Sequence, residues 1–332
     1  MHNKDRAVIR IGGGMTLTAL ICYGLALPVP HLGCIMAWIV LCQGKPLPLK
    51  KGIITGFLLL FILAGGILMV PLLEHYPFPS VLLTALFLYV FVMAGLKGKG
   101  AQSTLLTISV AIIPVAGLIE QALAVSIAIM MGVGFIIGAA VNYLAVVLLP
   151  SAPTPASPEN MVPVFPHQQA LIAVIIIIPV WMMALNDPAL CIPAVMKTVM
   201  LAQQASSGMA RKAGSGLVES TLVGALLSFI LWCGLSIWPS LLMLALWLGL
   251  LGAWVARRMV QLSVSSRPPA FWGDVWVTCL ILAGPAIQDS ASGDDVWRAA
   301  AVRCALYIAV ALYGWLCLSF LRSVTAGKEE MG

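Results

Sequence analysis

Residues 186–224 read NDPALCIPAVMKTVMLAQQASSGMARKAGSGLVESTLVG. The stretch consists of a proline-led apolar segment that contains Lys197, a basic turn formed by Arg211 and Lys212 between glycines and serines, and a second apolar segment. A lysine inside a segment of hydrocarbon length is costly, so it is either paired or used for function. The role of Lys197 therefore bears on the function of the whole chain.

The composition is that of an integral membrane protein. Of the 332 residues, 61% are hydrophobic and 9% are charged, against roughly 25% charged residues in soluble domains, and the mean hydropathy is +1.04. Lipid leaves helices and closed barrels as the spanning structures. The net charge of +6 comes from basic residues in short loops, a pattern that sets topology. We therefore expect no nucleic-acid partner.

Apolar runs of roughly 17 to 25 residues predict an all-α protein with about twelve transmembrane helices. The first six predicted helices are 11–27, 31–43, 53–73, 80–96, 103–119 and 122–149. The second six are 169–185, 189–205, 217–237, 240–256, 270–287 and 295–321. The second helix of each set is short and proline-led, so it could be a tilted or incomplete crossing. The first is interpreted as an uncleaved membrane helix rather than a signal peptide.

Charge alternates between successive loops. One side receives basic groups around Lys4, Lys51, Lys97, Arg211 and Arg258, and the other side receives acidic groups such as Glu74, Glu120, Asp187 and the turn 289–295. By the positive-inside rule both termini are cytoplasmic.

The chain divides into two similar halves. The predicted domains are a six-helix repeat at 1–149, a cytoplasmic Pro/Ser-rich linker at 150–168, a second six-helix repeat at 169–323 and a tail at 324–332. A shift of 160 positions superposes prolines, glutamines, basic residues and glycines of the two halves, namely Pro28 on Pro188, Gln43 on Gln203, Lys51 on Arg211 and Gly56 on Gly216, and Pro114 meets Pro285 at a larger shift. Because each half has an even number of spans, the repeat is predicted to be parallel.

No enzyme motif is found. The sequence holds no P-loop, no HExxH, no GxSxG and no clustered metal ligands. The eight cysteines lie in apolar segments without a CxxC pair, which is typical of small buried hydrophobes. We expect neither an enzyme nor a metal or cofactor.

Lys197 is the first candidate for the transport pathway. It lies about ten residues into its span, roughly 15 Å deep at ~1.5 Å per residue, which is near the middle of a bilayer. It could attract an organic anion, or it could snorkel or pair with an acid. Its counterpart in the first half is Ala37, which is apolar.

Other charged residues form a second tier of candidates. Arg211 and Lys212, with Lys50 and Lys51 as the matching pair, could gather anions at a cytoplasmic mouth or could only set topology. Arg303 lies about 7.5 Å deeper than Arg298 by helix rise, and it could line a pathway or form a buried pair.

Two acidic residues are candidates for proton coupling. Asp274 stands between Trp272 and Trp276, which more simply mark the membrane interface. Asp187 precedes Pro188 and is a typical helix cap, with proton coupling as the alternative.

Two stretches resemble a known family. They are TLTALICYGLALPVPHLGCIMAWIVLCQGKP at 16–46 and AVMKTVMLAQQASSGMARKAGSGLVESTLVGALL at 194–227. The order of a proline-led helix, a glutamine, a basic glycine-containing turn and a helix with spaced glycines resembles the fusaric acid resistance (FUSC) and aromatic acid exporter superfamily. It is most similar to the short membrane branch of unknown function that is often paired with HlyD-type adaptors. The resemblance implies a bacterial inner-membrane exporter of small organic anions, working with a periplasmic adaptor and an outer-membrane channel.

Three alternatives remain open. A major-facilitator-type carrier also has two parallel six-span halves, but the loop GKPLPLKKG at 44–52 lacks the acidic and Arg-Gly elements of its signature. An anion channel would need no alternating access. A membrane scaffold would use its charges only to hold partner proteins.

Overall fold

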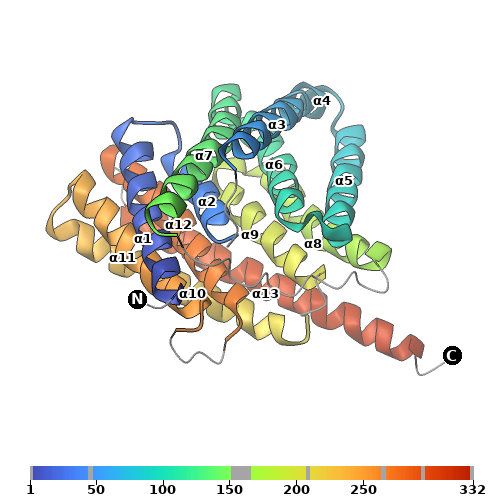
Figure 1. Ribbon diagram of the computed structural model, residues 1–332. Coiled ribbons are helices and arrows are strands. Elements are labelled where there is room, and N and C mark those ends of the chain that lie inside the picture. The colour runs from blue at the N-terminus through green and yellow to red at the C-terminus, as the bar shows by residue number, and fades with distance from the viewer. Residues whose placement is uncertain are drawn as a thin grey trace. The chain divides into compact units, whose positions relative to one another are not determined.

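The computed structural model describes residues 3–43, 48–150, 166–206, 210–262, 267–292 and 296–329. Within these ranges the protein is all-helical and has no strand (Figure 1). The α-helices are α1 Asn3–Gly24, α2 Pro30–Leu41, α3 Leu49–Ile67, α4 Met69–His75, α5 Pro77–Ala94, α6 Gly100–Ile119, α7 Gln121–Leu148, α8 Pro166–Asn186, α9 Pro188–Ser206, α10 Ala210–Ile237, α11 Leu241–Met259, α12 Pro269–Ser292 and α13 Val296–Glu329. A short π-helix, Gly95–Lys99, joins α5 to α6. The all-α prediction is confirmed.

Long apolar helices make this a multi-pass membrane protein. In the described part of the chain, eight helices are long and apolar enough to cross a bilayer, and three shorter apolar helices accompany them. Large apolar side chains such as Phe61, Phe78 and Leu250 are exposed on these helices, as lipid allows. α9 is in neither group, because Lys197 and the pair Gln203 and Gln204 interrupt its apolar sequence.

Several helix ends differ from the predicted ones. α1 begins at Asn3 rather than at residue 11 and includes the basic N-terminal residues. The third predicted helix breaks after Ile67, because the ring of Pro71 clashes with the carbonyl of the residue four positions earlier. α8 begins at Pro166, within the predicted linker, whose residues 151–165 lie outside the described ranges. α13 continues to Glu329, through most of the predicted tail.

Two compact units draw on both halves of the sequence. Unit 1 comprises Met1–Phe61, Ser126–Ser157 and Ser220–Ala301, and unit 2 comprises Ile62–Val125, Pro158–Glu219 and Val302–Gly332. Each unit therefore combines helices from before and after the linker. The repeat at 1–149 and 169–323 stays a prediction, because similarity in sequence does not require each half to pack on itself.

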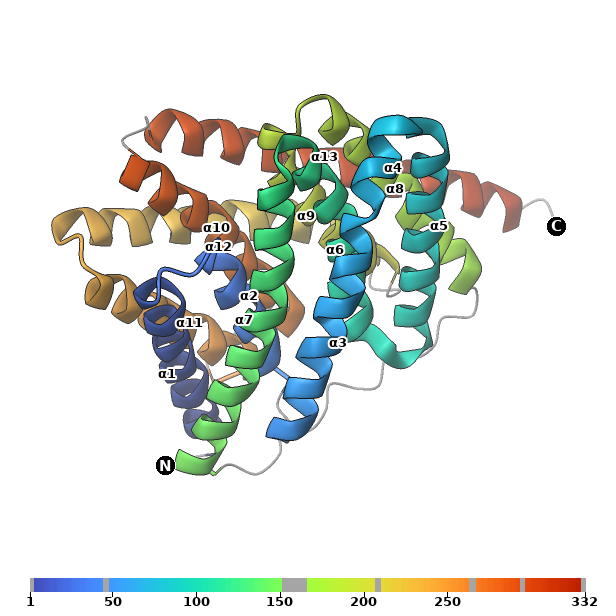
Figure 2. The same ribbon diagram turned by 90° about the horizontal axis from the view of Figure 1, so that it is seen from above.

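In unit 1, α1 lies beside α11, and the two run in opposite directions (Figure 2). Gly12 faces Ala253 near one end of the pair, and Gly24 faces Leu241 near the other. A Cβ on Gly12 would lie 2.7 Å from the Cβ of Ala253, so the glycine permits this close approach.

α2 is buried along nearly its whole length at the centre of unit 1. It runs parallel to α7, with Gly33 against Gly134 and Ala37 against Gly138. It runs antiparallel to α12, where His31 faces Gly284 and the rings of Trp38 and Trp276 lie 5.5 Å apart. α2 also packs on α1, where Leu41 faces Gly14. Such small residues let helices approach closely in lipid.

In unit 2, α9 packs on α6 and α8, and α5 packs on the same two helices. Trp181 of α8 donates from Nε1 to the carbonyl of Ala111 in α6 at 2.9 Å. The hydroxyl of Tyr89 in α5 lies 2.7 Å from Nδ1 of His167 in α8. At the other edge of unit 2, Gly66 faces Ile113, and Val70 faces Gly117, so this segment runs parallel to α6.

Candidate functional site

Lys197 lies at the centre of α9 and is 2% exposed. It is the ninth residue after Pro188, which places it about 14 Å from the start of the helix. Thr198 beside it is fully buried and donates its hydroxyl to the carbonyl of Ala194 at 2.7 Å. Lys197 also has an interaction within the protein.

The helix α6, which packs on α9, contributes buried hydroxyl groups to unit 2. Ser103, Thr107 and Ser109 are all almost fully buried. Thr107 donates to the carbonyl of Ser103 at 2.8 Å, and Ser103 donates to the carbonyl of Phe91. These bonds satisfy the hydroxyl donors of Ser103 and Thr107 within the protein.

Asp187 and Arg303 lie near the starts of their helices in unit 2. Asp187 is exposed and directly precedes α9, and its carbonyl accepts the N–H of Cys191 at 3.2 Å. Arg303 is half-buried on α13, one turn before the fully buried Tyr307. Both residues have interactions within the protein.

The two basic pairs of the proposed mouth occupy the first turns of helices. Lys50 and Lys51 are exposed at the start of α3. α10 begins at Ala210, so Arg211 and Lys212 have helical backbone rather than the predicted turn. The local apolar periodicity from Leu217 onward concealed this earlier start. The side chains of Arg211 and Lys212 lie outside the described residues.

Asp274 is half-buried on α12 in unit 1. Its backbone carbonyl accepts the hydroxyl of Thr278 at 2.7 Å. The prediction that the flanking tryptophans mark a lipid interface is wrong for Trp276, which is fully buried and packs against Trp38. Trp272 is also buried, and the guanidinium of Arg258 lies 4.7 Å from the centre of its ring.

The predicted site residues thus divide between the two units. Unit 2 holds Lys197, Arg303, Asp187, Arg211 and Lys212, and unit 1 holds Lys50, Lys51 and Asp274. Within the described residues no group of three or more His, Cys, Asp or Glu could hold a metal ion.

Two buried polar residues of unit 1 were missed by sequence reasoning. Arg10 is 5% exposed and lies within α1, which starts eight residues before the apolar run that predicted it. Asn142 of α7 is 2% exposed, and its Nδ2 has no hydrogen-bond partner. Gly14 faces Leu41, and Gly138 faces Ala37, so both polar residues lie near the carboxyl end of α2. An asparagine within an apolar run was the one available signal for Asn142.

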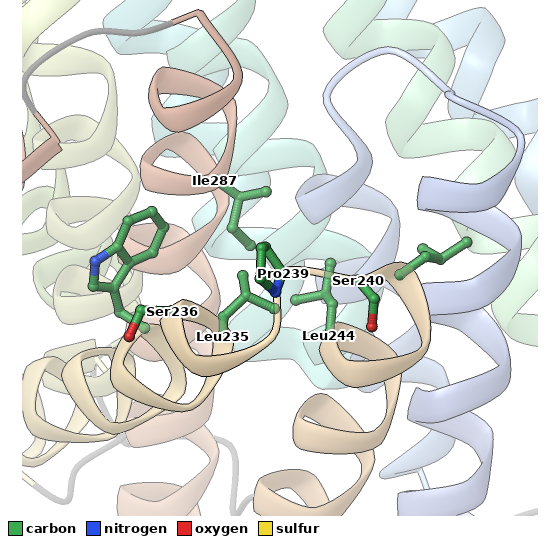
Figure 3. Close-up of a pocket in the computed structure, with 8 residues that line it drawn as sticks. Leu235, Ser236, Pro239, Ser240, Leu244 and Ile287 are labelled. Carbon is green, nitrogen blue, oxygen red and sulfur yellow. The ribbon is translucent and has the colours of Figure 1, made fainter.

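A pocket of about 470 Å³ lies in unit 1 at the turn between α10 and α11 (Figure 3). Its lining is mainly apolar, and Leu235, Pro239 and Ile287 point toward one another within it. Two hydroxyls also line it: Ser236 donates to the carbonyl of Cys233 at 2.8 Å, and Ser240 accepts the N–H of Met243 at 3.2 Å. The size is that of small-molecule sites.

A comparison with protein families gives a match over part of the chain. The model of a family described as "Protein of unknown function (DUF2955)" matches residues 7–145. This region covers α1 to α7 apart from their outermost residues. No curated protein and no solved structure matches the chain.

Proposed function

We propose that this protein is a transporter subunit of a bacterial inner membrane and exports small organic anions, with aromatic or amphipathic acids as the preferred class. The observation that carries the proposal is the burial of Lys197 at the centre of α9. A cation held away from water attracts an anion more strongly than it would at the surface, because the effective dielectric constant is lower. Intramembrane charges are by default associated with substrate or ion pathways.

The directions of packed helices support the proposed topology of alternating spans with both termini cytoplasmic. If every predicted helix crosses, odd and even spans run in opposite directions. α1 and α11 are the first and tenth spans and are antiparallel, while α2 and α7 are the second and sixth and are parallel. The parallel pair formed by the third and fifth spans, through Gly66 with Ile113, fits as well. This agreement favours a complete crossing by the short α2.

The distribution of charge in unit 1 supports the same orientation. Arg6 near the start of α1 donates to the carbonyl of Pro150, just beyond the end of α7, at 3.0 Å. Arg258 near the end of α11 lies over Trp272 near the start of α12. Because α1 and α11 are antiparallel, these basic groups share one end of the unit, which the positive-inside rule assigns to the cytoplasm.

The pocket at the α10–α11 turn supports an amphipathic substrate. Leu235, Leu244 and Ile287 offer apolar contacts for a ring or chain, and the hydroxyl of Ser240 can donate to a carboxylate. By the proposed topology this turn is on the non-cytoplasmic side, where a substrate would leave.

The partners and the energy source follow from the resemblance to aromatic acid exporters. An HlyD-type periplasmic adaptor, with an outer-membrane channel, would receive the anion on the far side. The sequence has no P-loop, so we propose coupling to the proton gradient, with Asp187 and Asp274 as candidates for the coupling residues.

Uptake of radiolabelled benzoate into inverted membrane vesicles tests the proposal. Lys197→Ala should lower uptake roughly tenfold or more, since a charge-assisted contact of about 1.5–3 kcal/mol corresponds to such a factor. Lys197→Arg should retain most of the uptake, and Lys97→Ala is the matched control, because Lys97 is exposed near the end of α5.

Equal uptake by the alanine, arginine and wild-type proteins would contradict the role of Lys197. A wild-type protein that moves no aromatic or aliphatic acid would contradict transport and favour a scaffold. Uptake that does not saturate with benzoate concentration would favour an anion channel over a carrier.

A further inference from the structure

Helix pairs of unit 1 recur in unit 2 under the sequence repeat. In unit 1, α1 packs on α2 and α11, and α12 packs on α2 and α11. In unit 2, α8 packs on α9 and α5, and α6 packs on α9 and α5. The repeat equates α1, α2, α11 and α12 with α8, α9, α5 and α6. Each of the four pairs in unit 1 therefore has its counterpart in unit 2.

The chain also passes between the units at equivalent points. The boundary within α3 lies at Phe61, and the boundary within α10 lies at Glu219. The 160-position shift carries Phe61 to position 221, two residues after Glu219. The boundary near the start of α7 lies at Val125, and that near the start of α13 lies at Ala301. The remaining boundary, at Ser157, falls in the predicted linker between the halves.

Side-chain bonds repeat in detail on the fifth helix of each half. Thr107 donates to the carbonyl of Ser103 at 2.8 Å in α6, and Thr278 donates to the carbonyl of Asp274 at 2.7 Å in α12. Both residues of the second bond stand 171 positions after those of the first, the same spacing that separates Pro114 from Pro285.

We infer that the two units are equivalent structures, formed by an exchange of helices between the two sequence halves. Each unit joins the first, second and sixth helices of one half to the fourth and fifth helices of the other. The equivalence places Lys197 against Gly314 and Asp187 against Arg303 in unit 2. The functional meaning of this placement rests on the proposed role of Lys197 in anion export.

The buried faces of the sixth helices and the unit boundaries together set the inferred register. Among the many buried residues of α7, several sets are spaced by three, one and three positions, and one of them is Met131, Gly134, Phe135 and Gly138. On α13 the buried residues Tyr307, Val310, Ala311 and Gly314 have the same spacing. The offset of 176 positions also superposes the unit boundaries at Val125 and Ala301.

This register places Lys197 of α9 opposite Gly314 of α13. In unit 1, Ala37 of α2 meets Gly138 of α7, and a Cβ on Gly138 would lie 2.6 Å from the Cα of Ala37. The counterparts of these two residues are Lys197 of α9 and Gly314 of α13. A glycine leaves room for the lysine stem at a crossing that two small residues close in unit 1.

The same register places the other two charges. α2 and α7 are parallel, so α9 and α13 run parallel in the inferred arrangement, and Arg303 is level with Asn186 and Asp187. Their counterparts in unit 1 are Leu27 and Ile127, which are apolar. Unit 2 therefore has three charged residues where unit 1 has an alanine, a leucine and an isoleucine.

These charges give unit 2 a path with two positions that can bind an anion. Asp187 and Arg303 form an ion pair at the end of the unit that the proposed topology assigns to the non-cytoplasmic side. Lys197 lies about 15 Å further along α9 by helix rise. An anion leaving Lys197 would displace Asp187 from Arg303 and so open its own exit, because the two anions compete for one guanidinium.

Disulfide trapping tests the placement in the full-length protein. In a background whose native cysteines are replaced, Lys197→Cys with Gly314→Cys should form a disulfide under mild oxidation, identified by mass spectrometry of the linked peptides. The pair Ala37→Cys with Gly138→Cys is the positive control, since their Cβ atoms would be 3.1 Å apart. This is shorter than the roughly 3.5–4.5 Å of a disulfide, so the bond forms once α2 and α7 move slightly apart. Lys197→Cys with Leu312→Cys is the control on the exposed face of α13.

A disulfide at 197–314 and at 37–138, without one at 197–312, is the expected result. Linkage at 37–138 alone, or at 197–312 in place of 197–314, would overturn the exchange register. Benzoate uptake by the Lys197 variants is measured separately, so the register can fail while the proposed function stands, and the reverse. If the protein without native cysteines does not fold, photo-crosslinking from a benzophenone amino acid at position 197 takes the place of disulfide trapping. The crosslink is then mapped to position 314 or to position 312 of α13.

Discussion

At the residue scale, the predicted repeat matches a small residue at a close helix contact with a charged residue. Gly138 lets α7 touch the backbone of α2 at Ala37, and the predicted 160-position repeat matches Ala37 with Lys197 of α9. The sequence predicted that Lys197 lies within an apolar helix, and its burial agrees. It did not predict the burial of Arg10, because the basic residues before an apolar run are read as loop when a helix can also include them.

The contact between Gly138 and Ala37 predicts a stability change. Gly138→Ala should lower the free energy of unfolding by about 1–3 kcal/mol, because the added methyl meets backbone that cannot move aside. Gly13→Ala is the matched control, since no atom lies within 4 Å of the added Cβ and the residue is exposed. There the helix should be stabilised by roughly 0.5–1 kcal/mol. Thermal unfolding in detergent measures both, and a similar melting temperature for the two variants would contradict the packing of α2 on α7.

At the element scale, tertiary contacts and prolines determine where helices begin and end, which apolar periodicity alone does not predict. Pro71 divides the third predicted span into α3 and α4, an effect visible in the sequence but outweighed there by the length of the apolar run. The existence of each helix was predictable because apolar runs and loop charges agree. The early starts of α1 and α10 were not, since they depend on polar residues that helices tolerate at their ends.

The corner between α11 and α12 predicts a role for one of two neighbouring arginines. Arg258 lies 4.5 Å from the ring centre of Trp254 and 4.7 Å from that of Trp272. Arg258→Gln should therefore cost about 1–2 kcal/mol through two cation–π contacts. Arg257→Gln removes the same charge from an exposed position on the same turn, so topology is affected equally in both variants. Chemical denaturation in detergent should separate them, and equal midpoints would count against the stacked arrangement.

The inferred pair between α9 and α13 predicts a charge reversal that can be repaired. Asp187→Arg and Arg303→Asp should each lower benzoate uptake several-fold, because each leaves two like charges at one level of unit 2. The double variant should recover most of the uptake, since the pair is restored with its ends exchanged. A double variant no better than the product of the single effects would show that the residues act independently.

At the scale of the whole molecule, each compact unit takes helices from both sides of the linker. Matched prolines, glycines and basic residues in the sequence predict a repeat of two six-helix halves, which stays a prediction. Which helices associate was not visible, because an apolar face shows that a helix is buried without showing its partner. Contacts such as Trp181 with Ala111, which lie on opposite sides of the linker, carry that information.

Exchange between the halves predicts that neither half is stable alone. Residues 1–157 contain α1 without α11, and residues 158–332 contain α9 without α6, so the small-residue faces of both lack their partners. Expressed singly, each fragment should be degraded or aggregate, and expressed together they should co-purify, because lipid-embedded helices can associate after separate insertion. Gly12→Trp in the first fragment should abolish co-purification by collision with Ala253, whereas Gly13→Trp should not, since Gly13 faces open space. Two fragments that each unfold cooperatively on their own would contradict the exchange, because helices that pack only within their own half would need nothing from the other.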